Sequence, residues 1–176
     1  MSLLKIITYG NPILRKKAKP IQKIDLALRK LSQDMIETMH EAEGIGLAAP
    51  QVGKSVSLFV VDISPLVDGA KPMAFLNIEI FDSEGSVPYN EGCLSIPKVT
   101  AEVRRPEKIK IRYMDMSGKK HQGTADGLLA RVIQHETDHV NGKLFVDHLD
   151  EKTLEEFLPV LNKLEAKNKK ILAKKS

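Results

Sequence analysis

Two histidines four residues apart, His135 and His139, restrict the conformation of the segment that carries them. On an α-helix, residues i and i+4 share a face, so both imidazoles can reach one metal ion. Glu136 lies one residue further round, where its carboxylate can touch a water at the metal without being a ligand. In residues 125–133, apolar side chains recur at helical spacing, and Asp126 can cap the start. The sequence therefore predicts a metal-binding helix.

The remaining pattern predicts an α+β fold, with antiparallel β-sheets packed around the central metal-binding helix and with N-terminal and C-terminal helices. Strands are expected in residues 57–63, 73–81 and 108–114. A turn at residues 116–119 is expected to lead into a return strand. Because no regular helices separate these strands, the pattern favours α+β over a doubly wound α/β sheet.

Two further helices are expected near the ends of the chain. The first begins at Asp25 and ends at Glu43-Gly44, where the glycine can take the left-handed conformation. The second covers residues 153–173, and Pro159 inside it can kink or delay the helix.

The length of 176 residues suits one domain with a sizeable core. No apolar run approaches the roughly 20 residues needed to span a bilayer, and the N-terminus lacks the apolar core of a signal peptide. We therefore expect a cytoplasmic protein that does not contact membranes. Cys93 is the single cysteine, which excludes an intrachain disulfide.

Two histidines do not complete a catalytic metal site, so a third protein ligand is needed. Cys93 is one candidate, because a thiolate is a strong, soft ligand for Zn²⁺ or Fe²⁺. Zincin peptidases usually have their third ligand downstream of the second histidine. The downstream candidates are Asp147, His148, Asp150 and Glu151.

Residues 44–53 combine two glycines and two alanines with a glutamine. Small residues leave the backbone exposed, so an extended peptide can pair there in the manner of a strand. Gln51 offers a neutral amide donor that can stabilise a developing oxyanion. The alternative is a loop whose small residues serve helix–strand packing.

Three segments, Gly44–Gln51, Glu91–Ser95 and Gln134–His139, together resemble the signature motifs of bacterial peptide deformylases in order and spacing. This resemblance implies a metal-dependent hydrolase that removes the N-formyl group from the formyl-methionine of nascent polypeptides and releases formate. It also implies a catalytic domain over residues 1–160 and a basic helical tail over residues 161–176.

The resemblance further implies a set of site residues. Glu136 would be the general base and then the general acid, while Gln51 and the Leu94 backbone N–H would bind the oxyanion. The metal would be Fe²⁺, with Zn²⁺, Ni²⁺ or Co²⁺ able to replace it. The metal ligands would be Cys93, His135 and His139. The residues expected to contact the substrate are Gly44, Ile45, Gly46, Glu91, Leu128 and Val132.

Two positions depart from the pattern of many family members. Thr100 stands where an arginine that contacts the substrate is common, and Arg104 and Arg105 follow further along the chain. Arg131 stands where an apolar pocket residue is common, so we expect a more polar mouth for the pocket that takes the methionine side chain. Asp138 is expected to form a partly buried pair with an arginine.

Six lysines and one glutamate follow residue 162. Such a segment is either a solvated, frayed terminus or a basic arm for an RNA surface. The resemblance implies contact with the ribosome through this tail. No dimer seam is evident, and we expect a monomer.

Two other functions remain open from the residues alone. A zincin-type metallopeptidase would take its third ligand from His148, Asp150 or Glu151 and would need neither Cys93 nor Gln51. A structural metal module would need a fourth protein ligand, and none is evident.

Overall fold

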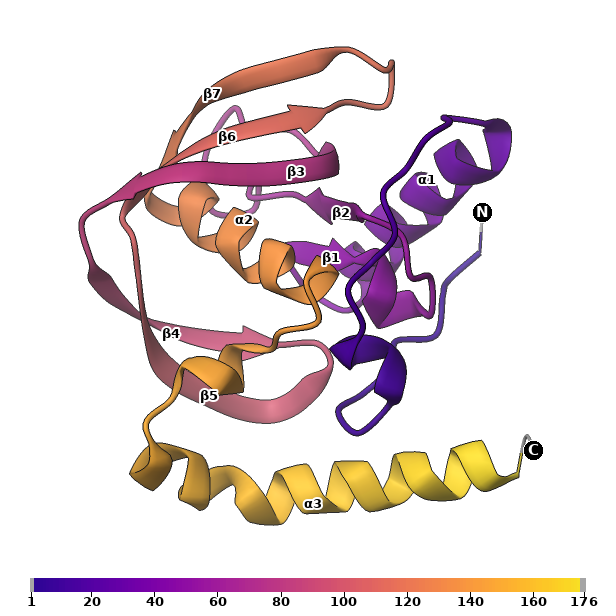
Figure 1. Cartoon of the computed structure of the whole chain (residues 1–176), viewed down its shortest axis with the longest axis vertical. Coiled ribbons are helices and arrows are strands. Elements are labelled where there is room, and N and C mark those ends of the chain that lie inside the picture. Colours follow the sequence, from indigo (N-terminus) through magenta and orange to yellow (C-terminus); the bar gives the residue numbers. More distant parts are fainter. Residues whose placement is uncertain (1, 175–176) are drawn as a thin grey trace.

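The computed structural model describes residues 2–174 and places one helix between two antiparallel sheets (Figure 1). The strand order of the larger sheet is β1-β2-β3-β6-β7. The predicted strands and the return strand after residue 119 are all confirmed in this sheet. Its strands are β1 (Gly46–Ala48), β2 (Leu58–Val61), β3 (Met73–Glu84), β6 (Lys108–Met114) and β7 (Lys120–Asp126).

The central helix α2 (Gly127–Val140) is the predicted metal-binding helix. Its Ala130, Val132 and Ile133 are buried in one core cluster with side chains of the larger sheet. Asp126 precedes the helix in an extended conformation, but its side chain makes no capping hydrogen bond. The chain instead enters the helix through Gly127, whose φ of 53° favours glycine.

The smaller sheet is a hairpin of β4 (Val87–Cys93) and β5 (Ile96–Arg105), which the sequence did not predict. It lies on the other side of α2 from the larger sheet (Figure 1). Alternate residues of β5 point inward, and Val99, Ala101 and Val103 belong to a second core cluster. This cluster also includes residues of α3 and of the 3-10 helix η3 (Phe145–His148).

Helix α1 (Leu26–Glu41) begins as predicted, because the Asp25 side chain accepts a hydrogen bond from the Leu28 N–H at 2.9 Å. Its C-terminal end differs from the prediction. The residue in the left-handed conformation is Glu43, with a φ of 54°, and not Gly44. A glycine is favoured at position 44 for another reason. A Cβ there would lie 2.9 Å from the Leu94 side chain.

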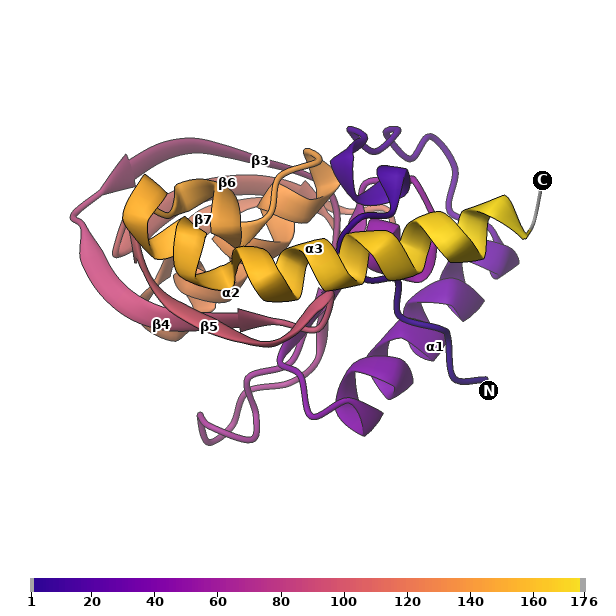
Figure 2. The same cartoon turned by 90° about the horizontal axis from the view of Figure 1, so that it is seen from below.

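Helix α3 (Glu151–Ala173) continues through Pro159 and crosses the underside of the hairpin (Figures 1 and 2). Its Asn168 is buried and donates to the Thr8 hydroxyl at 2.9 Å and to the Tyr9 carbonyl at 2.8 Å. A Cβ on Gly10 would collide with the α3 backbone. The expected domain boundary after residue 160 therefore falls inside a helix that is packed on the body of the protein. Across residues 2–174, no helix is both long and apolar enough to span a bilayer.

Candidate active site

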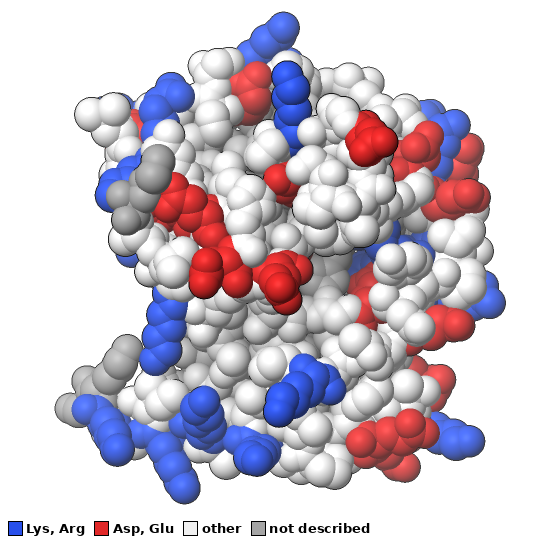
Figure 3. Space-filling view, turned by 180° about the vertical axis from the view of Figure 1, so that it is seen from behind, with Lys and Arg blue, Asp and Glu red and all other residues white. Residues whose placement is uncertain are grey.

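A cleft of about 570 Å³ opens between β1, the hairpin and the N-terminal half of α2. It faces the side of the molecule seen in Figure 3. Every metal-binding, catalytic or substrate-binding residue expected from the sequence lines this cleft, except His139. Leu66, Tyr89 and Lys98 also line it and were not expected. They lie on a loop and on the hairpin, where no periodic pattern or motif marks them.

The three expected metal ligands come together from two elements. Cys93 ends β4, whereas His135 and His139 lie one turn apart on α2. Their candidate ligand atoms all lie within 4.8 Å of one another, and Cys93 Sγ is 3.2 Å from His139 Nε2. One thiolate and two imidazoles form a donor set that suits Zn²⁺ or Fe²⁺ and leaves an open coordination position. The residues therefore fit a catalytic metal ion.

The proton distribution of this group also fits a metal. Burial alone would raise the pKa of the Cys93 thiol, but the adjacent His139 and His135 lower it to about 5. Burial alone would lower the pKa of His135, but hydrogen bonds to Cys93 and Glu91 raise it well above its usual range. The Cys93 thiolate is thus favoured, and His135 holds a proton that a bound metal ion would displace.

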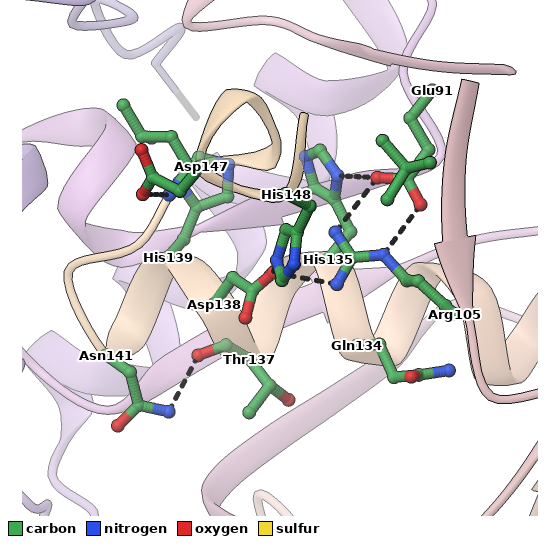
Figure 4. A network of polar contacts seen from close by, with 12 residues as sticks. Glu91, Arg105, Gln134, His135, Thr137, Asp138, His139, Asn141, Asp147 and His148 are labelled. Atoms are coloured by element: carbon green, nitrogen blue, oxygen red, sulfur yellow. Dashed lines mark hydrogen bonds and ion pairs between the residues drawn. The ribbon is translucent and has the colours of Figure 1, made fainter. Parts of the chain in front are cut away.

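The orientation of His135 is set by Glu91, as Figure 4 shows. Glu91 Oε2 accepts from His135 Nδ1 at 3.0 Å, which leaves Nε2 of the ring for a metal. The Glu91 carboxylate also accepts two hydrogen bonds from Arg105 and one from Arg131, at 2.7 to 2.9 Å. These four bonds use the acceptor positions of a carboxylate. Burial alone would raise the pKa of Glu91, but the hydrogen bond from His135 and the Arg105 guanidinium hold it well below its usual range.

The network continues from Arg105 toward the surface. Arg105 Nη1 donates to Asp138 Oδ2 at 2.7 Å, which confirms the expected pairing of Asp138 with an arginine. The same oxygen lies 2.7 Å from His148 Nε2 (Figure 4). Arg105 was not singled out from the sequence. Its place in the inward register of β5, after Val103, is the signal that would have marked a buried ion pair.

Arg131 corrects an expectation about the pocket mouth. It lines the cleft, but only 7% of its side chain is exposed. Its guanidinium turns into the hairpin and donates to the carbonyls of Val103 at 2.9 Å and Val87 at 2.6 Å. The mouth is therefore not made more polar by Arg131. Lys98 is the exposed cation that lines the cleft.

Glu136 is 3% exposed, and its Oε2 has no hydrogen-bond partner among the described residues. An unpartnered buried carboxylate oxygen is costly and calls for a functional explanation. Burial raises the pKa of Glu136 to about 7. Its carboxyl group can therefore both accept and release a proton near neutral pH.

Gly46 of β1 faces this carboxylate directly. A Cβ at position 46 would collide with Glu136 Oε1 and would lie 2.9 Å from Val132 Cγ1. The absence of a side chain thus creates the space that Glu136 occupies. β1 is the edge strand of the larger sheet, so its free edge is available to an extended peptide.

Gln51 lies in the 3-10 helix η2 (Ala49–Val52) and is 1% exposed. Its Oε1 accepts from the Ala48 N–H at 2.8 Å, which fixes the orientation of the amide. Nε2 therefore points the other way, 3.1 Å from Ser95 Oγ and 3.6 Å from Cys93 Sγ. Leu94 lies in the turn that follows Cys93 and also lines the cleft.

The downstream alternatives for the third ligand lie elsewhere. His148 pairs with Asp138, Asp147 pairs with Arg15, and Asp150 caps α3 by accepting from the Thr153 N–H. None of these side chains joins the group formed by Cys93 and the two histidines. The geometry thus disfavours the zincin arrangement.

Comparisons with known proteins agree with this geometry. Residues 3–155 match the family described as polypeptide deformylase. The peptide deformylase of Mesorhizobium japonicum is 45% identical over 150 residues, which cover 85% of each chain. That of Brucella suis is 41% identical over 175 residues, covering 98% of this chain and all of the relative. A crystal structure of a peptide deformylase from Legionella pneumophila superposes with a TM-score of 0.84 at 40% identity and covers 98% of both chains.

Proposed function

The chain belongs to the polypeptide deformylase family and removes the N-formyl group from nascent peptides in a metal-dependent hydrolysis, and from this premise we propose a role for each site residue. The strongest support for these roles is the group formed by Cys93, His135 and His139, which lies beside the unpartnered carboxylate oxygen of Glu136. The zincin-type alternative is not favoured, because none of its downstream candidates, His148, Asp150 and Glu151, belongs to the group formed by Cys93 and the two histidines.

Cys93, His135 and His139 hold one divalent metal ion. Glu91 does not contact substrate in this proposal. Its acceptor positions are taken by protein donors, and its role is to fix the ring of His135. When bound, the metal lowers the pKa of a water toward neutrality and polarises a carbonyl oxygen.

Glu136 moves the proton. Its unpartnered Oε2 accepts a proton from the attacking water, and the carboxyl group then delivers it to the amine nitrogen that leaves the formyl carbon. A pKa of about 7 suits both transfers, since neither protonation state is strongly disfavoured at neutral pH. Burial under Gly46 keeps the carboxylate from pairing with solvent.

Gln51 and Leu94 stabilise the charge that develops on the formyl oxygen. Gln51 Nε2 is pre-oriented toward Cys93 by the bond between its Oε1 and Ala48, so little reorganisation is needed during the reaction. The Leu94 backbone N–H supplies the second donor. Confined space around the carbonyl carbon would admit the hydrogen of a formyl group more readily than the methyl of an acetyl group.

The substrate backbone pairs with the free edge of β1 at Gly46 and with the preceding segment at Gly44. The methionine side chain enters the apolar part of the cleft, which is formed by Ile45, Leu128 and Val132. Lys98 takes the place of the arginine that relatives carry near position 100, because it is the exposed cation at the cleft.

Replacement of Glu136 by glutamine tests the proposed proton transfer. Glu136→Gln keeps the size of the side chain but removes the carboxylate, so turnover of formyl-Met-Ala-Ser should fall by about 10²–10⁴-fold. Metal content, measured by elemental analysis, should match that of the wild type. A metal-replete Glu136→Gln protein that releases formate at a near-normal rate would reject the assigned role.

We propose Fe²⁺ as the physiological metal, supported by the mixed thiolate and imidazole donor set. Anaerobic purification followed by elemental analysis and a formate-release assay tests this identity. Iron should be recovered near one equivalent, and activity should decline in air. Zinc or nickel in the anaerobically purified protein, with activity stable in air, would contradict the proposal.

We propose that the protein works as a cytoplasmic monomer and contacts the ribosome through the basic end of α3, residues 161–174. Lysines at 163, 167, 169, 170 and 174 are exposed there, and Figure 3 shows a band of basic side chains along this edge. In support of a monomer, the exposed large apolar side chains of the described residues are spread over separate segments. They are Leu3, Leu26, Leu66, Val67, Tyr89 and Leu158.

A further inference from the structure

Arg131 connects the two elements that carry the proposed metal ligands. It lies on α2, one turn before His135, and its guanidinium reaches both strands of the hairpin. Nη1 donates to Glu91 Oε1 and to the Val103 carbonyl, both at 2.9 Å, and Nη2 donates to the Val87 carbonyl at 2.6 Å. One side chain therefore joins α2, β4 and β5.

This connection matters because the hairpin is a separate sheet. β4 and β5 pair with each other, whereas the ladder of the larger sheet runs through the five other strands. No backbone ladder thus sets the distance between Cys93 on β4 and the histidines on α2. Side-chain contacts between the hairpin and the helix must do so.

The chemistry of arginine suits this task. A planar guanidinium presents five N–H donors in a rigid fork, whereas a lysine ammonium donates from a single nitrogen. Arg105 already supplies Glu91 with a fully buried positive partner through two hydrogen bonds. Arg131 is thus not needed to neutralise Glu91. Its distinctive contacts are the two carbonyls, one on each strand of the hairpin.

We propose that Arg131 is a positioning residue, which holds the hairpin against α2 so that Cys93 stays within ligating distance of His135 and His139. This inference rests on the proposed metal site. Loss of the arginine would remove a donor from the buried Val103 carbonyl and from the half-buried Val87 carbonyl, and would let the hairpin shift relative to the helix. Metal retention should weaken even though all three ligands remain present.

Metal affinity measured by chelator competition, on protein loaded with Zn²⁺ or Co²⁺, provides the test. Arg131→Met removes the three hydrogen bonds, so we expect affinity to fall by about 10–100-fold, as is typical when groups that support metal ligands are lost. Arg131→Lys should recover part of the loss. Arg104→Met is the matched control, because Arg104 is an exposed neighbour on β5 and should bind metal like the wild type.

A second set of measurements separates positioning from general destabilisation. Leu161→Ala truncates a buried side chain of α3 in the cluster under the hairpin and should lower the melting temperature without changing metal affinity. In Co²⁺-loaded protein, the absorption band of the thiolate–cobalt bond should change in Arg131→Met and stay unchanged in Leu161→Ala. If the methionine variant fails to fold, Arg131→Lys, which keeps a positive charge, provides the measurement. Amide hydrogen exchange in β4 and β5 should rise in this variant.

Several outcomes would overturn the inference. These are wild-type metal affinity in Arg131→Met, an equal loss of affinity in Leu161→Ala, or unchanged hairpin exchange in Arg131→Lys. Failure of the proposed function looks different, because the wild-type protein itself would then bind no stoichiometric metal.

Discussion

At the scale of single residues, the centre of the site depends on a glycine, Gly46. The Glu136 carboxylate occupies the space in front of Gly46, and a Cβ there would also press on Val132. The proposed general base and the strand proposed to bind the substrate backbone thus share one small volume. A side chain at position 46 must displace the Glu136 carboxylate.

Gly46→Ala should therefore inactivate the enzyme while leaving the fold intact. A displacement of the base by about 1 Å can cost about 100-fold in rate, and we expect at least this loss in kcat on a formyl-Met peptide. Gly123→Ala is the matched control, because a Cβ on Gly123 in β7 would meet no other atom within 4 Å and the variant should keep full activity. Normal turnover by Gly46→Ala would show that Glu136 does not need this space.

The sequence predicted which residues come together at the cleft better than it predicted their surroundings. Motifs identified Cys93, Glu136 and the two histidines, because local spacing on a helix and a tight turn carries that information. Glu91 was assigned to the substrate, yet its carboxylate is bonded to protein groups. Arg105 and Arg131 lie 14 and 40 residues from Glu91 in the chain, so no local pattern predicts that they meet there.

At the scale of elements, the ends of α1 and β2 are joined by a buried carboxylate. Asp62 follows β2, accepts from the Ser64 N–H at 2.9 Å and lies 2.7 Å from His40 Nε2 near the end of α1. Burial alone would raise the pKa of Asp62, but the hydrogen bonds from Ser64 and the pairing with His40 lower it. The ionised form is thus the one that stabilises the fold.

This pKa direction predicts how stability varies with pH. Because the folded-state pKa lies below the unfolded value near 3.9, the contribution of Asp62 is present above that value. It is lost as the pH falls through the folded-state pKa. Asp62→Asn should reduce the free energy of unfolding by about 1–3 kcal/mol at pH 6, and the gap from wild type should begin to narrow as the pH falls below about 3.9.

Urea unfolding of both proteins between pH 3 and 7 gives this difference directly. Asp82→Asn serves as the control, because Asp82 pairs with Lys110 on an exposed part of the sheet and should contribute little. A gap between Asp62→Asn and wild type that is constant over the whole range would contradict the assigned role of the charge.

Regular periodicity decided which elements were predictable. The three helices and the long strands were found because their apolar residues repeat over many positions, and Asp25 marks one helix start. The hairpin was missed because Pro88, Gly92 and Pro97 interrupt it, although β5 alternates regularly after Pro97. β1 is three residues long, too short for a pattern to be recognised. The left-handed conformation after α1 was expected at Gly44, because glycine adopts it most readily. It occurs one residue earlier, at Glu43.

At the scale of the whole molecule, charge is unevenly distributed over the surface. Exposed lysines line the C-terminal part of α3, whereas acidic side chains gather on the other side of the cleft and at the N-terminal end of α3 (Figure 3). A basic edge attracts the phosphate backbone of RNA, and such attraction weakens steeply with salt. The cleft would then stand beside the surface from which nascent chains emerge.

Reversal of charge on α3 tests this arrangement. Lys163→Glu, Lys167→Glu and Lys170→Glu together should weaken ribosome binding strongly at low salt while leaving activity on a short formyl-Met peptide unchanged. These side chains are exposed, so Leu161 and Asn168 keep their packing, which truncation of the helix would disrupt. Lys119→Glu with Lys120→Glu, at the turn before β7, is the control. Ribosome affinity that is insensitive to salt and equal in both variants would count against the proposal.

The bond between Asn168 and Thr8 joins residues 160 positions apart and has a consequence for the order of events during synthesis. The Ile7 and Tyr9 amides can pair with Gln51 and Ser95 as soon as those residues emerge. The carbonyls of Thr8 and Tyr9 accept hydrogen bonds from Asn168, and Gly10 packs against the α3 backbone. These contacts form only after the last turns of α3 have left the ribosomal exit tunnel. Early parts of a chain generally fold first, so the contacts between α3 and residues 8–10 form late in folding. The N-terminal segment of a new chain thus lacks these partners until residues about 160 positions later have been made.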